Sequence, residues 1–317
     1  MSDVTAVNNL VDKYHLLKSE IGKLIVGQDE AVKFTLLSIF CGGHSLLIGV
    51  PGLAKTLLVN TVSDVLGLNF KRIQFTPDLM PSDILGSEIL DENRQFKFIK
   101  GPIFSNIILA DEINRTPPKT QAALLEAMQE RSVTISGTHY KLELPFFVLA
   151  TQNPIEQEGT YPLPEAQLDR FMFSINLEYP TFSEEVQVVK NTTSTLTQDI
   201  NSVLSGQEII DIQNLIRKIP VTDNVIEYAV SLVGKTRPKS KEATEMVKSY
   251  LDWGAGPRAS QNLILAAKAY AAISGKYSPD IEDVKFVAIP ILSHRIVKNY
   301  KAEAEGISIS NIIKSLL

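Results

Sequence analysis

The sequence lacks several features that whole classes of protein require. A single cysteine, Cys41, has no partner for a disulfide within the chain, which excludes a disulfide-stapled secreted framework. No window approaches 18 uncharged apolar residues, and no basic segment followed by an apolar one opens the chain. We therefore expect a cytoplasmic protein without membrane insertion. The histidines show no metal-ligand spacing: His15, His44, His139 and His294.

An excess of positive charge is also missing. The formal net charge is −5, so the overall field offers nucleic acid no general attraction, and we expect no nucleic-acid partner. Hydrophobic residues make up 44% and charged residues 21%, as in globular proteins. A length of 317 residues, at about 150 residues per domain, predicts about two domains.

The patterns along the chain divide it into an α/β region and a helical region. Short apolar runs alternate with helical stretches as far as residue 178, which is typical of a parallel sheet covered by helices. The polar tract 190–207 indicates a linker or a weakly packed helix connection. We predict domains over 1–179 and 208–317 with a linker over 180–207. The expected strands are 45–48, 70–75, 106–110, 146–151 and 172–177, and the expected late helices are 208–218, 223–235, 258–274 and 281–299.

A glycine-rich segment lies between the first expected strand and a helical pattern. It reads GVPGLAKT over residues 49–56, and this context suits a phosphate-binding loop, where backbone N–H groups and a helix N-terminus surround an anion. Lys55 would reach the β- and γ-phosphates, and the Thr56 hydroxyl would ligate Mg²⁺. The alternative is an ordinary turn with a chance Lys-Thr. The expected binding residues are Gly49, Pro51, Gly52, Leu53, Ala54, Lys55, Thr56 and Leu57.

Ala54 departs from the phosphate-loop pattern, which has glycine at this position. A methyl group is tolerable there only if the residue has near-helical φ and ψ. We therefore expect that geometry at Ala54.

Two adjacent carboxylates, Asp111 and Glu112, follow the expected strand 106–110. Ligands of open α/β sheets bind at this end of the strands, and paired acids there need a cation or a proton. Asp111 can hold Mg²⁺ through its water shell, and Glu112 can polarise a water that attacks the γ-phosphate. The alternative is a pair of ordinary turn acids.

The pairing of GVPGLAKT with ILADEINR, residues 108–115, resembles the Walker A and Walker B motifs of AAA+ ATPases, and among them the MoxR family. Val26 and Gly27, in the segment IVGQ, are similar to the family's adenine-side motif. The resemblance implies ATP and Mg²⁺. It also implies an α/β fold, an AAA+ P-loop NTPase core with a five-stranded parallel sheet in the order 5-1-4-3-2, followed by an all-α lid.

Further family positions carry polar or charged residues. Asn153 resembles sensor 1, which orients the attacking water; a turn-initiating Asn-Pro is the alternative. Arg170, in LPEAQLDRF, resembles the arginine finger that a neighbouring subunit supplies. A salt bridge from Arg170 to Asp169 or Glu165 is the alternative, and Arg115 ranks second as the finger at the same interface.

The segment WGAGPRAS resembles sensor 2 and places Arg258 at the start of a helix. An extra helix before sensor 2 displaces the lid in such relatives, so Arg258 could reach a neighbour's nucleotide. Trp253 is expected to pack in the lid core. Cys41 is expected to be a small buried hydrophobe.

Two segments resemble hairpin insertions of this branch. One spans 87–99 around Glu92-Asn93-Arg94, and the other spans 131–144 with a turn at 137–139. Related hairpins point into the pore of a hexamer, and Tyr140 is the side chain expected to grip a client. Ordinary surface hairpins are the alternative.

The family implies an ATP-hydrolysing, chaperone-like homo-oligomer, a hexameric ring that remodels, activates or inserts metal into a protein client beside a von Willebrand factor A domain partner. Two other functions stay open. One is a nucleic-acid motor of the same branch, and the other is a nucleotide-gated binding module with little turnover.

Overall fold

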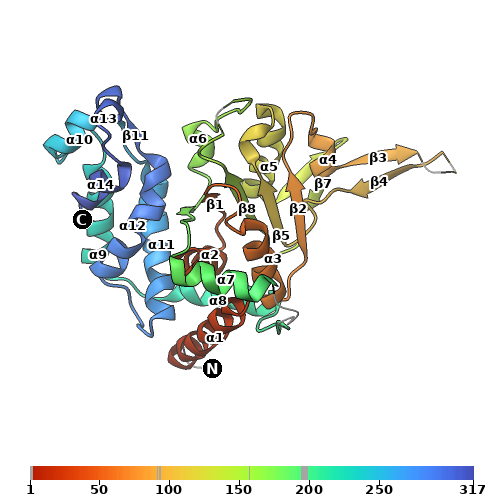
Figure 1. The fold of residues 1–317 in the computed structure, drawn as a ribbon, viewed down its shortest axis with the longest axis horizontal. Coiled ribbons are helices and arrows are strands. Elements are labelled where there is room, and N and C mark those ends of the chain that lie inside the picture. Colours follow the sequence, from red (N-terminus) through yellow and green to blue (C-terminus); the bar gives the residue numbers. More distant parts are fainter. Residues whose placement is uncertain (1–2, 91, 93, 157, 194–198) are drawn as a thin grey trace.

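The computed structural model consists of an α/β domain and a mainly helical lid that lie side by side, with a long hairpin projecting from the α/β domain (Figure 1). It describes residues 3–90, 92, 94–156, 158–193 and 199–317. No helix within those ranges combines the length and the apolar character needed to cross a membrane.

Five parallel strands form the central sheet in the order β2-β5-β8-β1-β9. Numbered along the chain as 1 to 5, this is the predicted order 5-1-4-3-2. Each predicted boundary lies within one residue of the observed one. The strands are β1 (Ser45–Ile48), β2 (Phe70–Gln74), β5 (Ile107–Asp111), β8 (Phe147–Gln152) and β9 (Phe173–Asn176).

Helices cover both faces of the sheet, which explains why the apolar runs of β5 and β8 are almost continuous. Successive residues point to opposite faces, so Leu46 and Ile108 enter one core while Leu47 and Leu109 enter the other. The larger core also includes the lid. The helices of this domain are α1 (Asp3–Gly22), α2 (Asp29–Cys41), α3 (Lys55–Val65), α4 (Pro81–Leu85), α5 (Pro118–Glu130) and α6 (Glu165–Leu168), with the 3₁₀ turn η1 (Ile113–Arg115).

The predicted linker over 180–207 contains a helix, α7 (Phe182–Thr193). The alternative of a weakly packed helix agrees better, because none of its side chains is buried. Residues 194–198 of the tract lie outside the described residues.

The lid contains four longer helices and a short β-ribbon. The helix predicted over 281–299 ends at Leu292, because 3₁₀ turn η2 (Ser293–Arg295) follows and β11 (Val297–Lys298) pairs antiparallel with β10 (Leu251–Trp253). The sequence did not predict this ribbon. The helices are α8 (Gly206–Lys218), α9 (Asp223–Lys235), α10 (Glu245–Tyr250), α11 (Pro257–Ile273), α12 (Ile281–Leu292), α13 (Tyr300–Ala304) and α14 (Ile309–Lys314).

Both predicted hairpins are present. The first pairs β3 (Gly86–Leu90) with β4 (Phe96–Lys100). Asn93 of its predicted tip and Asp91, the predicted end of its first strand, lie outside the described residues. The second pairs β6 (Ser132–Ile135) with β7 (Thr138–Lys141). Its turn is the two-residue Ser136-Gly137, with φ of 48° and 82°, and not the predicted 137–139. Positive φ at both positions matches the twist of a tight hairpin.

Tyr140 lies within strand β7 and not at the tip of its hairpin, and its expected grip on a client stays a prediction. Its ring stacks on Phe98 of the first hairpin, with centroids 4.4 Å apart, and meets the edge of Phe104. Tyr140 therefore joins the two hairpins to each other.

Candidate active site

The carboxyl ends of three neighbouring strands bring the predicted phosphate-side residues together. The phosphate loop follows β1, Asn153 follows β8, and Asp111 ends β5, and these strands are adjacent in the sheet. A cleft of about 350 Å³ lies between them. It is lined by Pro51, Gly52, Ala54, Lys55, Thr56, Leu57, Asp111, Glu112 and Asn153.

Two loop residues that do not line the cleft, Leu53 and Gly49, pack against the protein interior and fix the shape of the loop. Leu53 is buried, and a Cβ at Gly49 would lie 2.9 Å from the Leu177 Cβ, so the loop needs glycine there. Lys55 Nζ donates to the Gly49 carbonyl at 2.6 Å. Partial burial lowers the pKa of the Lys55 ammonium, and the nearby charges of Asp111 and Glu112 oppose that shift.

Ala54 has φ 53° and ψ 27°, which is the left-handed region. The expectation of near-helical geometry is wrong, because the chain turns through this residue before α3 begins. A Cβ in this region meets the following carbonyl oxygen, which costs about 1–2 kcal/mol. The free protein therefore holds strain in its phosphate loop.

Replacing Ala54 with glycine should raise the free energy of unfolding by about 1 kcal/mol, because it removes this strain. Urea denaturation measures the change. The matched control is Ala122→Gly on an exposed, right-handed position of α5, where the loss should be about 1 kcal/mol. Equal or lower stability of Ala54→Gly would mean that the loop is unstrained.

Asp111 is held in place by two other strands. Its Oδ1 accepts a hydrogen bond from Thr151 Oγ1 at 2.7 Å, and its Oδ2 accepts from Arg72 Nε at 3.0 Å and Nη2 at 2.6 Å. Arg72 lies on β2 and is an ion-pair partner that sequence reasoning missed. With Arg72 and Thr151 already bound, Asp111 suits the predicted water-mediated contact to a cation.

Glu112 turns its carboxylate toward the cleft from a left-handed residue with φ 56°. Gln74 Nε2 donates to its Oε2 at 2.7 Å, and Arg115 Nη1 donates to the same oxygen at 3.0 Å. The Glu112 backbone N–H donates to Thr151 Oγ1 at 2.8 Å. These partners orient a carboxylate that can accept a proton from water.

Asn153 is 9% exposed. Its Nδ2 donates to Glu156 Oε2 at 3.3 Å, and its Oδ1 accepts from the Ile155 N–H at 3.2 Å. The latter bond fits the alternative of a turn, so the amide both shapes the loop after β8 and lines the cleft. These two uses are compatible.

The residues of this cleft fit a magnesium nucleotide. Gly52 has φ +88° and open space where a Cβ would lie, Lys55 supplies a positive charge, and the Thr56 hydroxyl and Asp111 carboxylate are ligands that Mg²⁺ prefers. No group of three His, Cys, Asp or Glu suited to a metal occurs among the described residues. Mg²⁺ would thus be held largely by phosphate and water oxygens.

The predicted adenine-side residues lie apart from this cleft. Gly27 lines a second cavity of about 460 Å³ between the start of α2 and the lid, and Val26 is half-buried beside it in the chain. Phe286 and Pro290 of α12 and Lys314 of α14 line the lid side. The Glu184 side chain of α7 lies where a Cβ at Gly27 would point.

Arg170 lies at the N-terminal ends of the strands, opposite the carboxyl ends where the phosphate cleft lies. It precedes β9, which runs parallel to β1 with Ser45 opposite Phe173 and Ile48 opposite Asn176. The phosphate loop follows Ile48, so the length of β1, about 13 Å at 3.3 Å per residue, separates the two positions along the sheet. Arg170 Nη1 donates to the Leu125 carbonyl at 2.6 Å. The alternative of a salt bridge to Asp169 or Glu165 does not form.

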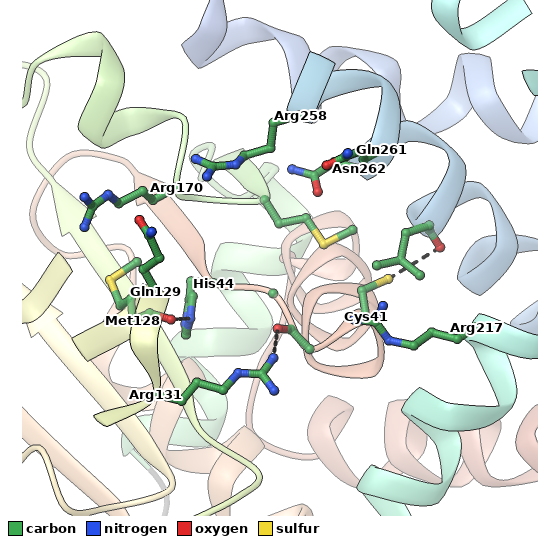
Figure 2. A pocket seen from close by; sticks show the side chains of 14 residues that line it. Cys41, His44, Met128, Gln129, Arg131, Arg170, Arg217, Arg258, Gln261 and Asn262 are labelled. Carbon is green, nitrogen blue, oxygen red and sulfur yellow. Dashed lines mark hydrogen bonds between the residues drawn. The ribbon is translucent and has the colours of Figure 1, made fainter. Parts of the chain in front are cut away.

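A cavity of about 270 Å³ opens beside Arg170 between the α/β domain and the lid (Figure 2). None of the residues that line it is acidic, and four of them are arginines: Arg131, Arg170, Arg217 and Arg258. Several guanidinium groups around one cavity without an acidic lining residue favour an anionic ligand.

Comparison with known proteins decides the family. The profile described as "ATPase family associated with various cellular activities (AAA)" matches residues 44–173, and an AAA lid domain matches residues 243–316. Chaperone MoxR1 of Mycobacterium tuberculosis is 44% identical over 299 residues, which cover 94% of this chain and 79% of that protein. This chain belongs to the MoxR family of AAA+ ATPases.

Two other proteins are also similar to this chain over most of its length. Protein MoxR of Methylorubrum extorquens is 30% identical over 293 residues, which cover 87% of this chain and 85% of that protein. The crystal structure of a proposed ATPase from Cytophaga hutchinsonii superposes with a TM-score of 0.91 at 46% identity, covering 98% of this chain and 94% of that one.

In this MoxR-family chain Arg258 lies on the Arg170 side. Its Nη1 donates to Asp169 Oδ2 at 3.1 Å, and it lines the arginine cavity rather than the phosphate cleft. Trp253 is 68% exposed, so the expectation that it packs in the lid core is wrong: it lies on the ribbon strand β10. Cys41 is buried as predicted.

Arg115 lies at the phosphate edge, just after β5, and pairs with Glu112 of its own chain. The hydrogen bond and charge of Glu112 raise the pKa of the Arg115 guanidinium. The ranking of Arg115 second to Arg170 as the finger at one interface stays a prediction. Arg115 orients the carboxylate that faces the cleft.

Proposed function

We propose that the chain hydrolyses ATP in a homo-oligomeric ring, hexameric as the family resemblance implies, and that each ATP is bound between two subunits. The observation that carries this proposal is the placement of Arg170 and the phosphate loop at opposite edges of one sheet. A subunit that offers its Arg170 edge to a neighbour's cleft can complete that cleft, and repetition of this contact closes a ring.

The residues of the cleft would divide the chemistry. Lys55 binds the β- and γ-phosphates, and Thr56 and Asp111 hold Mg²⁺, which neutralises phosphate charge when bound. Glu112 accepts the proton of the attacking water, which Asn153 helps to orient. The neighbour's Arg170 would stabilise the charge that develops on the transferring phosphoryl group, and Arg258 beside it would contact the same phosphate.

ATPase activity per subunit should rise with protein concentration, because an isolated subunit lacks the second half of its site. We expect at least a tenfold increase across the assembly transition, measured by steady-state phosphate release alongside light scattering. Specific activity that is the same for monomers and oligomers would contradict a shared site.

We also propose a chaperone-like action in the cytoplasm, in which hydrolysis moves the hairpins against a protein client. The client is activated, remodelled or loaded with metal beside a von Willebrand factor A domain partner, as the family resemblance implies. Support comes from the first hairpin, which extends away from the body (Figure 1) and exposes Leu90 and Phe96 by 60% and 74%. These two residues are cross-strand partners on one face.

Leu90→Ser combined with Phe96→Ser should abolish capture of the client by ATP-trapped protein while leaving basal ATPase within about twofold, because the pair lies far from the phosphate cleft. Pull-down with the Glu112→Gln variant measures capture. Val230→Ser, an exposed apolar residue of α9, is the matched control. Full capture by the double variant would exclude this face as the client contact.

A further inference from the structure

One aspartate joins the lid to the segment that carries Arg170. Asp169, the preceding residue, accepts a hydrogen bond from Arg295 Nε through Oδ1 at 2.8 Å and from Arg258 Nη1 through Oδ2 at 3.1 Å. Both arginines belong to the lid, Arg258 to α11 and Arg295 to η2 after α12. The finger segment therefore shares a carboxylate with two lid arginines.

Arg295 uses all five N–H groups of its guanidinium. Besides the Asp169 carboxylate, Nη2 donates to the carbonyl oxygens of Asp169 at 3.2 Å and Phe171 at 2.5 Å. Nη1 donates to the carbonyl oxygen of Met172 at 3.2 Å and to that of Ile291. Three backbone carbonyls on either side of Arg170 are thus held by one planar group. Lysine, with three donors and no fork, cannot reproduce this set.

The two lid arginines differ in exposure. The Arg295 side chain is 1% exposed and that of Arg258 is 44% exposed. Burial lowers the pKa of the Arg295 guanidinium and the Asp169 charge opposes the shift, so the pair is stable only while it stays together. If Arg258 turns toward a phosphate, Arg295 still neutralises Asp169. Arg295 is therefore the fixed partner and Arg258 the movable one.

Neighbouring contacts strengthen the anchor. His294 Nε2 hydrogen-bonds the Phe171 carbonyl at 3.0 Å, so two consecutive residues of η2 hold this segment. The preceding helix α12 contributes Phe286 and Pro290 to the adenine-side cavity. Two consecutive lid elements, α12 and η2, thus reach the adenine-side cavity and the segment that carries Arg170.

We propose that Arg295 is a positioning residue for ATP hydrolysis: it fixes the backbone of residues 169–172 so that Arg170 is presented to the γ-phosphate held by the next subunit. The proposal rests on the trans-acting Arg170 proposed above. Arg295 itself does not touch the nucleotide. Its effect should therefore be confined to the subunit that donates the finger.

Mixed oligomers separate the two roles of a subunit. Glu112→Gln subunits donate a finger but do not hydrolyse, and Arg170→Ala subunits accept one. Adding Arg295→Lys to the donor should reduce the recovered kcat by about 10- to 100-fold with KM for ATP within about twofold, because misplacement of a catalytic group costs rate. Adding Arg295→Lys to the acceptor should leave the recovered kcat unchanged. A general structural defect would reduce both.

Two further variants complete the test. Lys285→Gln, at a half-buried lysine of α12 that pairs with Glu282, is the matched donor control and should donate normally. If thermal melting shows that Arg295→Lys is unstable, Asp169→Asn takes its place in the donor subunit. This variant keeps an oxygen for Arg295, so it should give a weaker loss of recovered kcat that is again confined to the donor. Full donation by the Arg295→Lys donor, or equal loss in donor and acceptor, would overturn the proposal. If the mixture of Glu112→Gln and Arg170→Ala recovers no ATPase activity, Arg170 does not act on the neighbouring subunit, and this inference is overturned with it.

Discussion

Glu112→Gln should bind ATP normally and stop turning it over, whereas Lys55→Ala should bind ATP poorly. The amide that replaces the Glu112 carboxylate keeps its size and an oxygen for Arg115, so the cleft retains its shape, but an amide cannot accept the proton of water. Loss of a general base lowers kcat by about 10²–10⁴-fold. Loss of the Lys55 ammonium removes a charge-assisted phosphate contact of about 1.5–3 kcal/mol, which is about 10- to 100-fold in affinity.

Equilibrium binding of a fluorescent ATP analogue and steady-state phosphate release measure the two effects separately. Glu126→Gln, an exposed carboxylate on α5, is the control for a general loss of charge and should behave as the unchanged protein. Equal loss of ATP affinity in Lys55→Ala and Glu112→Gln would contradict the division of roles.

The sequence predicts those parts of the fold that are decided by residues close together in the chain. Continuous apolar runs predict β5 and β8, because both faces of these strands are covered. The glycine-rich segment after β1 and the acids after β5 predict the cleft, since parallel strands end at one edge. Arg170 comes before a strand of the same parallel sheet, so its position at the other end of the strands from the cleft also follows from the sequence.

Contacts between distant segments could not be predicted. Arg72 and Thr151 reach Asp111 from strands 39 and 40 residues away in the chain, and Arg295 reaches Asp169 across 126 residues. Each is a common polar residue with no local pattern. Three-dimensional packing alone decides these partners.

The conformation and the exposure of certain single residues could not be predicted from the sequence either. Alanine prefers right-handed geometry, so nothing in the sequence indicated a left-handed Ala54. Aromatic residues usually pack inside, yet Trp253 lies on an exposed ribbon that two short strands form only by pairing with each other. Tyr140 is held by the other hairpin, which sequence order does not place beside it.

Arg170→Ala should bind ATP nearly as the unchanged protein and lose about 10³–10⁵-fold in kcat, because an arginine finger acts on the transition state. The Arg170 side chain donates to the Leu125 carbonyl of α5, and neither residue lines the phosphate cleft, so removal of the side chain leaves that cleft intact. ATP affinity and kcat should therefore separate.

Mixing Arg170→Ala with Glu112→Gln should restore activity that neither variant has alone. In a randomly assembled 1:1 ring, roughly a quarter of the interfaces join an intact cleft of one subunit to an intact Arg170 of the next. Activity should peak at intermediate ratios and vanish at either extreme. The control mixes Arg170→Ala with the double variant that lacks both residues, and it should recover nothing because no finger is present. If no ratio of the single variants restores turnover, the two halves of the site do not come from different subunits, and the placement of Arg170 at the far edge of the sheet needs another explanation.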